Sequence, residues 1–200
     1  MKKQPLFRFI HCSDLHLDSP FEGIQSIEPW VADILRKATF EAFQRVVKIA
    51  IQKKCDFVII SGDIYDGADR SLYAKLRFRE MLKELNESQI KCFLVHGNHD
   101  PLSGWEPEIT LPQGIFRFPG DKVNLIPFTK NSQEIAHIYG ISFQEKANMN
   151  NLTKLFQKSS KEVFSIGVLH CNVGGLPKHD NYAPCSIEDL VNTGLDYWAL

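Results

Sequence analysis

The chain has 200 residues, of which 44% are hydrophobic, so it can bury a sizeable core as one domain and is not a disordered or low-complexity sequence. Lysine and arginine together number 23 and aspartate and glutamate 24, and this balance excludes a polycation that binds nucleic acid through bulk charge. Five widely spaced cysteines without a CxxC pair, and no apolar run long enough for a membrane span or a signal peptide, predict a cytoplasmic protein without a disulfide framework.

Short apolar runs alternate with longer amphipathic stretches in the first half of the chain. Leu6–His11 is predicted to be a strand, and Trp30–Lys54 a long helix with apolar residues at helical spacing. Phe57–Ile60 is a continuous apolar run, typical of a strand that is buried on both faces. Ser71–Glu87 is predicted to be a second helix, and Cys92–Val95 another buried strand.

The second half of the chain begins with a segment rich in proline and glycine, residues 101–130, which we expect to be an irregular surface excursion. The alternation then resumes, with strands predicted at Ile135–Ile141, Val163–Leu169 and Asp196–Leu200 and helical segments at Leu152–Lys158 and Ser186–Asn192. This pattern predicts an α/β fold around a largely parallel sheet, in a single domain that spans residues 1–200.

Polar side chains follow four of the predicted strands at the point where each strand ends. They are Asp14 and His16 after the first strand, Asp63 after the second, Asn98, His99 and Asp100 after the third, and His170 after a later one. Because the carboxyl ends of parallel strands form the binding edge of an α/β sheet, we expect these side chains to converge there.

The side chains at this edge form a ligand set for divalent metals. Carboxylate, imidazole and amide oxygen suit manganese, iron or zinc, and the thiolates of a structural zinc site are missing from the set. Asp63 can bridge two ions, which lie roughly 3.5–4 Å apart in two-metal hydrolases. Asp14 and His16 are two residues apart, so an extended segment would point both the same way. Gly62 and Gly97 would let the backbone turn sharply and approach the metals or a phosphate.

Three motifs, Asp-Leu-His, Gly-Asp-Ile-Tyr-Asp and Gly-Asn-His-Asp, occur in this order with a strand before each, and they resemble the calcineurin-like metallophosphoesterases. The longer stretches DLHLDSPF, VHGNHD, LHCN and HDNYAP resemble the DNA-repair exonuclease branch, which includes SbcD nuclease subunits and YhaO-type proteins. The resemblance covers the chain from about Leu6 to Leu200. It implies a β-sheet sandwich flanked by helices, and two divalent metal ions, Mn²⁺ ahead of Fe²⁺ or Zn²⁺.

The resemblance also implies a role for each residue that matches a motif. The metal ligands would be Asp14 and His16 for the first ion, Asp63 as the bridge, and Asn98 and His170 for the second ion. His99 would contact the phosphate and stabilise the transition state or assist the leaving oxygen, and Asp100 would orient His99. A hydroxide held by the metals would attack phosphorus in line with the departing oxygen.

One part of the family pattern lies beyond this sequence. The family supplies two more histidines in a Gly-His-x-His motif, directly after a strand like Asp196–Leu200, and the sequence ends at Leu200. We therefore expect a C-terminally incomplete fold that lacks one ligand for each metal and binds metal weakly. The branch further implies a DNA substrate, an ATPase partner of the structural-maintenance type, and a homodimer.

Other functions stay open at this point. A phosphatase or phosphodiesterase for small-molecule or protein phosphoesters would use the same chemistry, and a non-catalytic binding module is the alternative for the chain as given. Asp66 is predicted to be a turn residue that orients the loop carrying Asp63, and His96 a core histidine. Basic residues such as Arg77 and Arg79 are predicted to form a solvated helix face, with a DNA-facing patch as the alternative.

Overall fold

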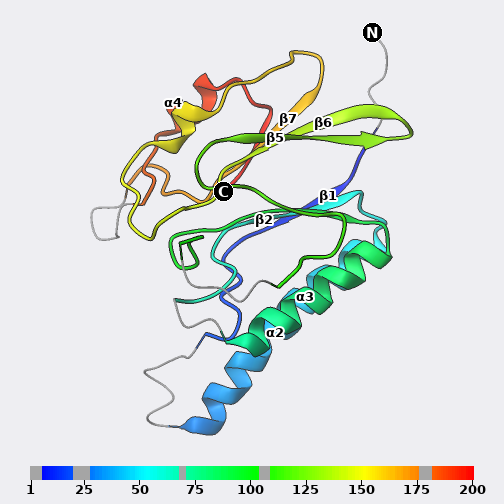
Figure 1. Cartoon of the computed structure of the whole chain (residues 1–200), viewed down its shortest axis with the longest axis vertical. Helices are drawn as coiled ribbons and strands as arrows, with labels where there is room; N and C mark the ends of the chain where they lie inside the picture. The colour runs from blue at the N-terminus through cyan, green and yellow to red at the C-terminus, as the bar shows by residue number, and fades with distance from the viewer. Residues whose placement is uncertain (1–5, 20–27, 68–70, 104–108, 176–181) are drawn as a thin grey trace.

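Two four-stranded sheets lie face to face in the computed structural model of the chain, which describes residues 6–19, 28–67, 71–103, 109–175 and 182–200 (Figure 1). The first sheet has the order β1-β2-β3-β4, with β1 at Phe9–Cys12, β2 at Phe57–Ser61, β3 at Lys91–Val95 and β4 at Ile115–Arg117. The second has the order β5-β6-β7-β8, with β5 at Asn124–Lys130, β6 at Gln133–Gly140, β7 at Phe164–Val168 and β8 at Tyr197–Ala199.

Helices cover the two outer sides of this sandwich. They are α2 at Pro29–Gln52, α3 at Leu72–Glu87, the short 3-10 helix η1 at Leu152–Leu155 and α4 at Ile187–Asn192. Figure 1 shows α2 and α3 side by side below the first sheet, and α4 beyond the second. Ser71 starts α3, since its side chain accepts a hydrogen bond from the backbone N–H of Ala74 at 3.0 Å.

Strand β2 lies between two hydrophobic cores, which is why its sequence is apolar throughout. Val58 and Ile60 pack under α2 and α3, whereas Phe57 and Ile59 face the second sheet. The ring of Phe57 lies 4.8 Å from that of Phe128 in β5, measured between centroids, so aromatic packing joins the two sheets. One strand fills both cores because successive side chains point to opposite faces.

Two strands lie in residues 101–130, where we expected irregular structure, and that expectation is wrong. β4 has only three residues, and β5 contains Pro127, which lacks the N–H of a central strand. Both are edge strands of their sheets, where short length and a missing N–H are tolerated. The single, largely parallel sheet is also corrected, because the strands divide between two sheets and β5 runs antiparallel to β6.

The α/β sandwich flanked by helices, which the resemblance implied, is confirmed. The helical segment expected at Leu152–Lys158 is shorter, since only η1 forms there. Within the described part of the chain, no helix has both the length and the apolar character that a membrane crossing needs.

Candidate metal centre

The five predicted ligands lie at one end of the sandwich, where strands of both sheets end. His16 Nε2 is 3.9 Å from Asp14 Oδ1 and 4.0 Å from Asp63 Oδ2, and His170 Nε2 is 3.2 Å from Asp63 Oδ2. Asn98 follows Gly97, whose backbone lies against the side chains of Asp63 and His170. The expected convergence is therefore present, but His170 comes from the second sheet and not from the sheet that carries Asp63.

The loops after β1 and β2 are paired along their backbones, which fixes the first ligands. Asp14 N–H donates to Gly62 O at 3.1 Å, and His16 N–H donates to Asp63 O at 3.1 Å. Asp14, His16 and Asp63 have φ angles of 54°, 41° and 49°, the left-handed region that non-glycine residues rarely adopt. The expected extended segment between Asp14 and His16 is thus wrong; a tightly turned loop presents both side chains.

Gly62 and Gly97 are needed because ligand side chains press against them. A Cβ on Gly62 would lie 2.6 Å from the Cβ of His170, and Gly62 has a φ of +100°. A Cβ on Gly97 would lie 2.2 Å from Asp63 Oδ1. The prediction that the backbone turns sharply here is confirmed for Gly62, and the groups that approach most closely are the predicted ligands themselves.

Several buried polar atoms of the described residues at this centre lack a hydrogen-bond partner. Among the described residues, Asn98 Oδ1, His170 Nε2 and His16 Nδ1 are buried without a hydrogen bond, which is costly for a polar group. His170 Nδ1 donates to Ser61 O at 2.9 Å, and this bond holds Nε2 toward Asp63. Ligand atoms of Asp14, His16 and Asp63 also lie within 4.8 Å of one another. This donor set fits divalent metal ions.

His99 is oriented by a different carboxylate from the one expected. Its Nδ1 lies 2.9 Å from Asp66 Oδ1, and its backbone N–H donates to Asp63 Oδ1 at 3.0 Å. Asp66 also accepts a hydrogen bond from the Ser19 hydroxyl at 2.7 Å. The signal for this contact was in the sequence, since Asp66 ends the Gly-Asp-Ile-Tyr-Asp motif three residues after Asp63.

Asp100 lies beneath the turn, fully buried, and the expectation that it contacts His99 is wrong. It accepts hydrogen bonds from Gly97 N–H at 2.7 Å, from Ile64 N–H at 3.1 Å and from the His96 ring at 2.9 Å. These bonds tie the loop after β3 to the loop after β2. Asp100 therefore holds the turn that presents Asn98, and it cannot reach around that turn to the His99 ring.

Ion contacts keep the central carboxylates charged. Burial raises the pKa of Asp63, but its contacts with His170 and His99 outweigh burial, and the net pKa is lowered. Burial likewise raises the pKa of Asp66, but its contacts with Ser19, His99 and His16 outweigh burial, so the net pKa of Asp66 is lowered. Burial lowers the pKa of His170, while Asp63 and the Ser61 carbonyl raise it by more. Charged carboxylates are the form that binds metal.

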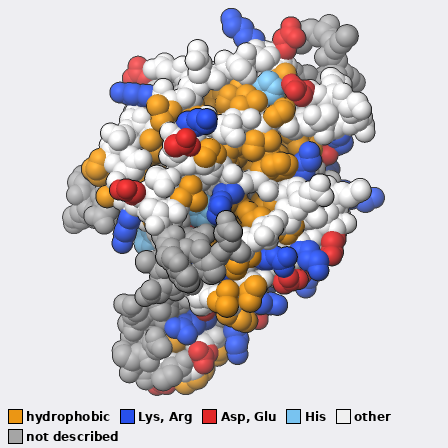
Figure 2. Space-filling model, in the orientation of Figure 1, with side chains coloured by type: hydrophobic (Ala, Val, Ile, Leu, Met, Phe, Trp, Pro, Cys, Tyr) orange, Lys and Arg blue, Asp and Glu red, His pale blue; other side chains and the backbone are white. Residues whose placement is uncertain are grey.

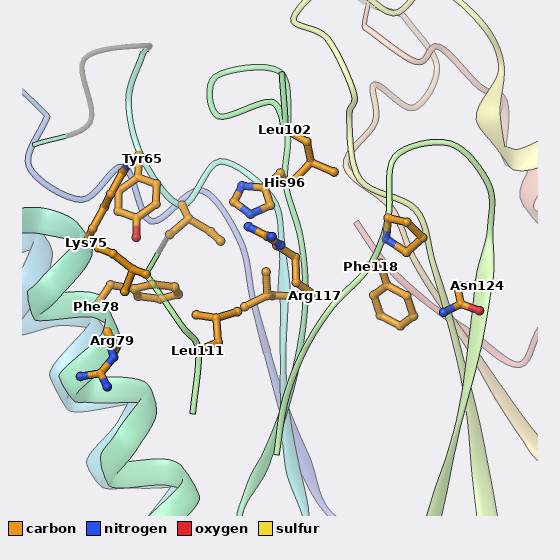
Figure 3. A pocket seen from close by; sticks show the side chains of 14 residues that line it. Tyr65, Lys75, Phe78, Arg79, His96, Leu102, Leu111, Arg117, Phe118 and Asn124 are labelled. Carbon is orange, nitrogen blue, oxygen red and sulfur yellow. The ribbon is translucent and has the colours of Figure 1, made fainter. Parts of the chain in front are cut away.

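A cavity of about 640 Å³ lies behind the turn that carries these ligands. In Figure 3, Tyr65, Lys75 and Phe78 lie on one side of the cavity, and His96 and Arg117 on the other. The His96 ring contacts Asp100, so the cavity adjoins the back of the metal-binding turn. None of the five predicted ligands is among the described residues that line this cavity.

One aromatic side chain near the centre was missed by the sequence interpretation. The ring of Tyr182 stacks on His170 at a centroid distance of 5.3 Å and an interplanar angle of 4°. Tyr182 belongs to the HDNYAP stretch, of which residues 179–181 lie outside the described residues. The last two residues of DLHLDSPF, 20 and 21, lie outside them as well.

The two-sheet sandwich, with carboxylate, imidazole and amide side chains gathered at one end, has the fold and the donor set of a metallophosphoesterase domain. Residues 7–198 match the family described as Calcineurin-like phosphoesterase, and the chain belongs to this family. The resemblance stated from the motifs is thereby confirmed.

Similar proteins include a bacterial and two archaeal relatives. The chain is 38% identical over 193 residues to the uncharacterized metallophosphoesterase YhaO of Bacillus subtilis, and the match covers 96% of this chain and 47% of that protein. It is 28% identical over 169 residues to the DNA double-strand break repair protein Mre11 of Sulfolobus acidocaldarius, and this match covers 82% of this chain and 41% of that protein. It is 26% identical over 200 residues to the Mre11 of Sulfurisphaera tokodaii, covering 96% and 48%. The chain thus spans about half the length of these relatives, or less.

Proposed function

We propose that this protein is a manganese-dependent DNA nuclease that acts in DNA repair. The observation that carries the metal-dependent chemistry is the set of unpartnered buried atoms on Asn98, His170 and His16 around the charged carboxylate of Asp63. The choice of DNA over other phosphoesters is supported by the DNA-repair proteins among the similar sequences. Manganese is proposed because it accepts octahedral sites of mixed oxygen and nitrogen ligands.

Each group at the centre has a part in phosphodiester hydrolysis. His16 Nε2 lies 4.0 Å and His170 Nε2 lies 3.2 Å from the same oxygen of Asp63, Oδ2, so this carboxylate can serve an ion beside either histidine. When bound, the ions polarise the phosphoryl group and supply a nucleophile from water at neutral pH. Asp14 is half exposed at the rim, and its carboxylate and that of Asp63 supply the negative charge that holds cations there.

His99 is placed to handle the proton of the leaving oxygen. Its side chain is 41% exposed, and its ring lies 5.2 Å from that of His16, so it borders the space where a phosphate would lie. Asp66 binds Nδ1, which leaves Nε2 directed away from the carboxylate. Nε2 can then donate a proton to the departing oxygen, which is general acid catalysis.

Mutations of the full-length protein separate these roles. We expect manganese to support degradation of DNA, and Asp63→Ala to abolish both metal binding by calorimetry and DNA cleavage. His99→Ala should keep metal binding and lose cleavage, because His99 acts on the phosphate. His137→Gln is the matched control, since His137 pairs with Glu134 at 3.0 Å in a contact that involves none of the predicted ligands, and both properties should survive.

Two results would contradict the proposal in different ways. Brisk hydrolysis of small phosphoesters with intact DNA would favour the phosphatase or phosphodiesterase alternative. Absence of hydrolysis with any divalent metal would favour a non-catalytic binding module. The ATPase partner and the homodimer remain predictions, to be tested by co-purification and light scattering of the full-length protein.

A further inference from the structure

A shallow groove of about 290 Å³ lies between the outer faces of α2 and α3. Four basic side chains line it, Lys37, Arg45 and Lys48 from α2 and Arg77 from α3. Figure 2 shows Lys and Arg side chains next to hydrophobic ones over the lower part of the molecule, where Figure 1 places these helices. The groove shares no residue with the metal centre.

The charges of the groove are largely uncompensated. Lys37, Lys48 and Arg77 are exposed and, within the described part of the chain, form no ion pair. Arg45 lies 4.0 Å from Glu41, and Glu84 of α3 accepts a hydrogen bond from Gln44. Four cations therefore meet two carboxylates in a chain whose net charge is −1. A local excess of positive charge in such a chain suits a polyanion.

An aromatic ring stands in the same groove with one face open. Tyr73 is 60% exposed and lies edge-on to the buried Phe40, with a centroid distance of 5.6 Å and an interplanar angle of 74°. Phe40 fixes the Tyr73 ring and leaves its outer surface to solvent. Cations that track a backbone, combined with an exposed aromatic ring that stacks on bases, are the two components of single-strand binding sites.

The dimensions and the position of the groove fit a single strand that leads to the metal centre. Lys37 and Lys48 are eleven residues apart, so they span about 16 Å along the helix axis, which is long enough for several nucleotides of a single strand. The Ser71 hydroxyl, at the start of α3, donates to Asp18 at 2.5 Å, and Asp18 is two residues after His16. The start of α3, two residues before Tyr73, is thus tied to the loop that carries His16.

We propose that this groove binds a stretch of single-stranded nucleic acid, with phosphates on Lys37, Lys48 and Arg77 and a base stacked on Tyr73. The inference rests on the proposed nuclease function and names the surface that guides a strand to the site. An acidic segment of a partner protein could use the cations but would gain nothing from the open aromatic ring.

Salt dependence of binding tests the phosphate contacts. The full-length protein is titrated against a labelled 20-nucleotide single strand by fluorescence anisotropy, in EDTA so that no cleavage occurs, at several salt concentrations. In the triple variant Lys37→Gln, Lys48→Gln and Arg77→Gln, the slope of log K against log salt should fall by about 2, since each single-strand phosphate contact contributes about 0.7.

A matched control removes the same charge elsewhere. Lys53, Lys54 and Lys161 are exposed and lie outside the groove, and the triple substitution to glutamine should leave the slope close to that of the parent. Hydrolysis of bis-p-nitrophenyl phosphate with manganese reports whether the metal centre is intact, and it should be equal in both triple variants.

The stacking contact is tested separately. Tyr73→Ala should weaken binding of the strand roughly 5- to 160-fold, the range for loss of one base–aromatic stack, whereas Tyr73→Phe should keep it. Poly-glutamate serves as the competing polyanion without bases. If poly-glutamate binds as tightly as the strand and Tyr73→Ala changes neither, the groove is a site for acidic protein and the proposal is overturned.

Failure of this inference differs from failure of the proposed function. Equal slopes for the groove variant, the control variant and the parent would overturn the groove while leaving manganese-dependent DNA cleavage in place. Loss of strand binding in the groove variant would support the groove even if no variant cleaved DNA, and that absence of cleavage would contradict the nuclease alone.

Discussion

His99 and Asp66 form a pair whose separate parts can be measured. Asp66 accepts from the His99 ring and holds it over the centre, while Ser19 holds Asp66 in turn. Asp66→Asn keeps the shape of the side chain but replaces the carboxylate that orients the His99 ring, so kcat for DNA cleavage should fall about 10–100-fold, as for the loss of other orienting partners. Ser19→Ala leaves the pair in contact and should cost less. Equal activity of Asp66→Asn and the parent would show that His99 needs no carboxylate.

Asp100 should matter for stability before it matters for chemistry. Its side chain is fully buried and accepts three hydrogen bonds, from Gly97, Ile64 and His96. Asp100→Ala leaves these donors without an acceptor and should lower the free energy of unfolding by about 3 kcal/mol. In a chain of this size the midpoint of thermal unfolding would fall by about 6–12 °C. If Asp100→Ala left the thermal midpoint unchanged and abolished DNA cleavage, Asp100 would act in catalysis and not in stability.

At the scale of the elements, the apolar pattern was informative where an element is buried. Strands β2 and β3 and helices α2 and α3 could be predicted because their sequences carry the burial pattern themselves. β4 and β5 could not, because edge strands are short or carry residues such as Pro127 that a central strand would exclude. The left-handed turns at Asp14, His16 and Asp63 were also hidden, since such angles depend on pairing between two loops distant in the sequence.

The loop after β2 allows a clean test of steric fit. Gly62 and Gly67 both have positive φ, +100° and +80°, so alanine strains the backbone at either position. At Gly62 the new Cβ would also lie 2.6 Å from His170, whereas at Gly67 nothing lies within 4 Å. Gly62→Ala should therefore displace His170 and weaken manganese binding at least tenfold by calorimetry. Gly67→Ala should bind manganese like the parent and lose about 1–3 kcal/mol of stability from strain.

If both alanine variants bound manganese equally, the close approach of His170 to Gly62 would have no part in metal binding. Circular dichroism of the two variants should match that of the parent. This control shows that a variant that binds manganese weakly is still folded. The comparison thus isolates one contact between the two sheets.

At the scale of the whole molecule, the site depends on how two sheets stack. The order of motifs in the sequence predicted that Asp14, Asp63, Asn98 and His170 would converge. The same interpretation placed all four residues on one sheet, which was wrong, because the alternation of strands and helices in a sequence does not show which strands are hydrogen-bonded to one another. Packing of Phe57 against Phe128 in β5, and of Phe7 against Phe164 in β7, stacks the two sheets and brings His170 to Ser61 and Asp63.

Because the predicted ligands come from both sheets, metal should stabilise the sandwich as a whole. Manganese at about 100 times its dissociation constant should add about 2.7 kcal/mol to the free energy of unfolding, since it binds only the folded chain. That corresponds to a rise of about 5–11 °C in the thermal midpoint, and EDTA should reverse it. His170→Ala removes the ligand of the second sheet, so only part of the rise should remain, while His137→Gln should respond like the parent. A thermal midpoint of the full-length protein that does not move with manganese would mean that these side chains do not bind the ion across the two sheets.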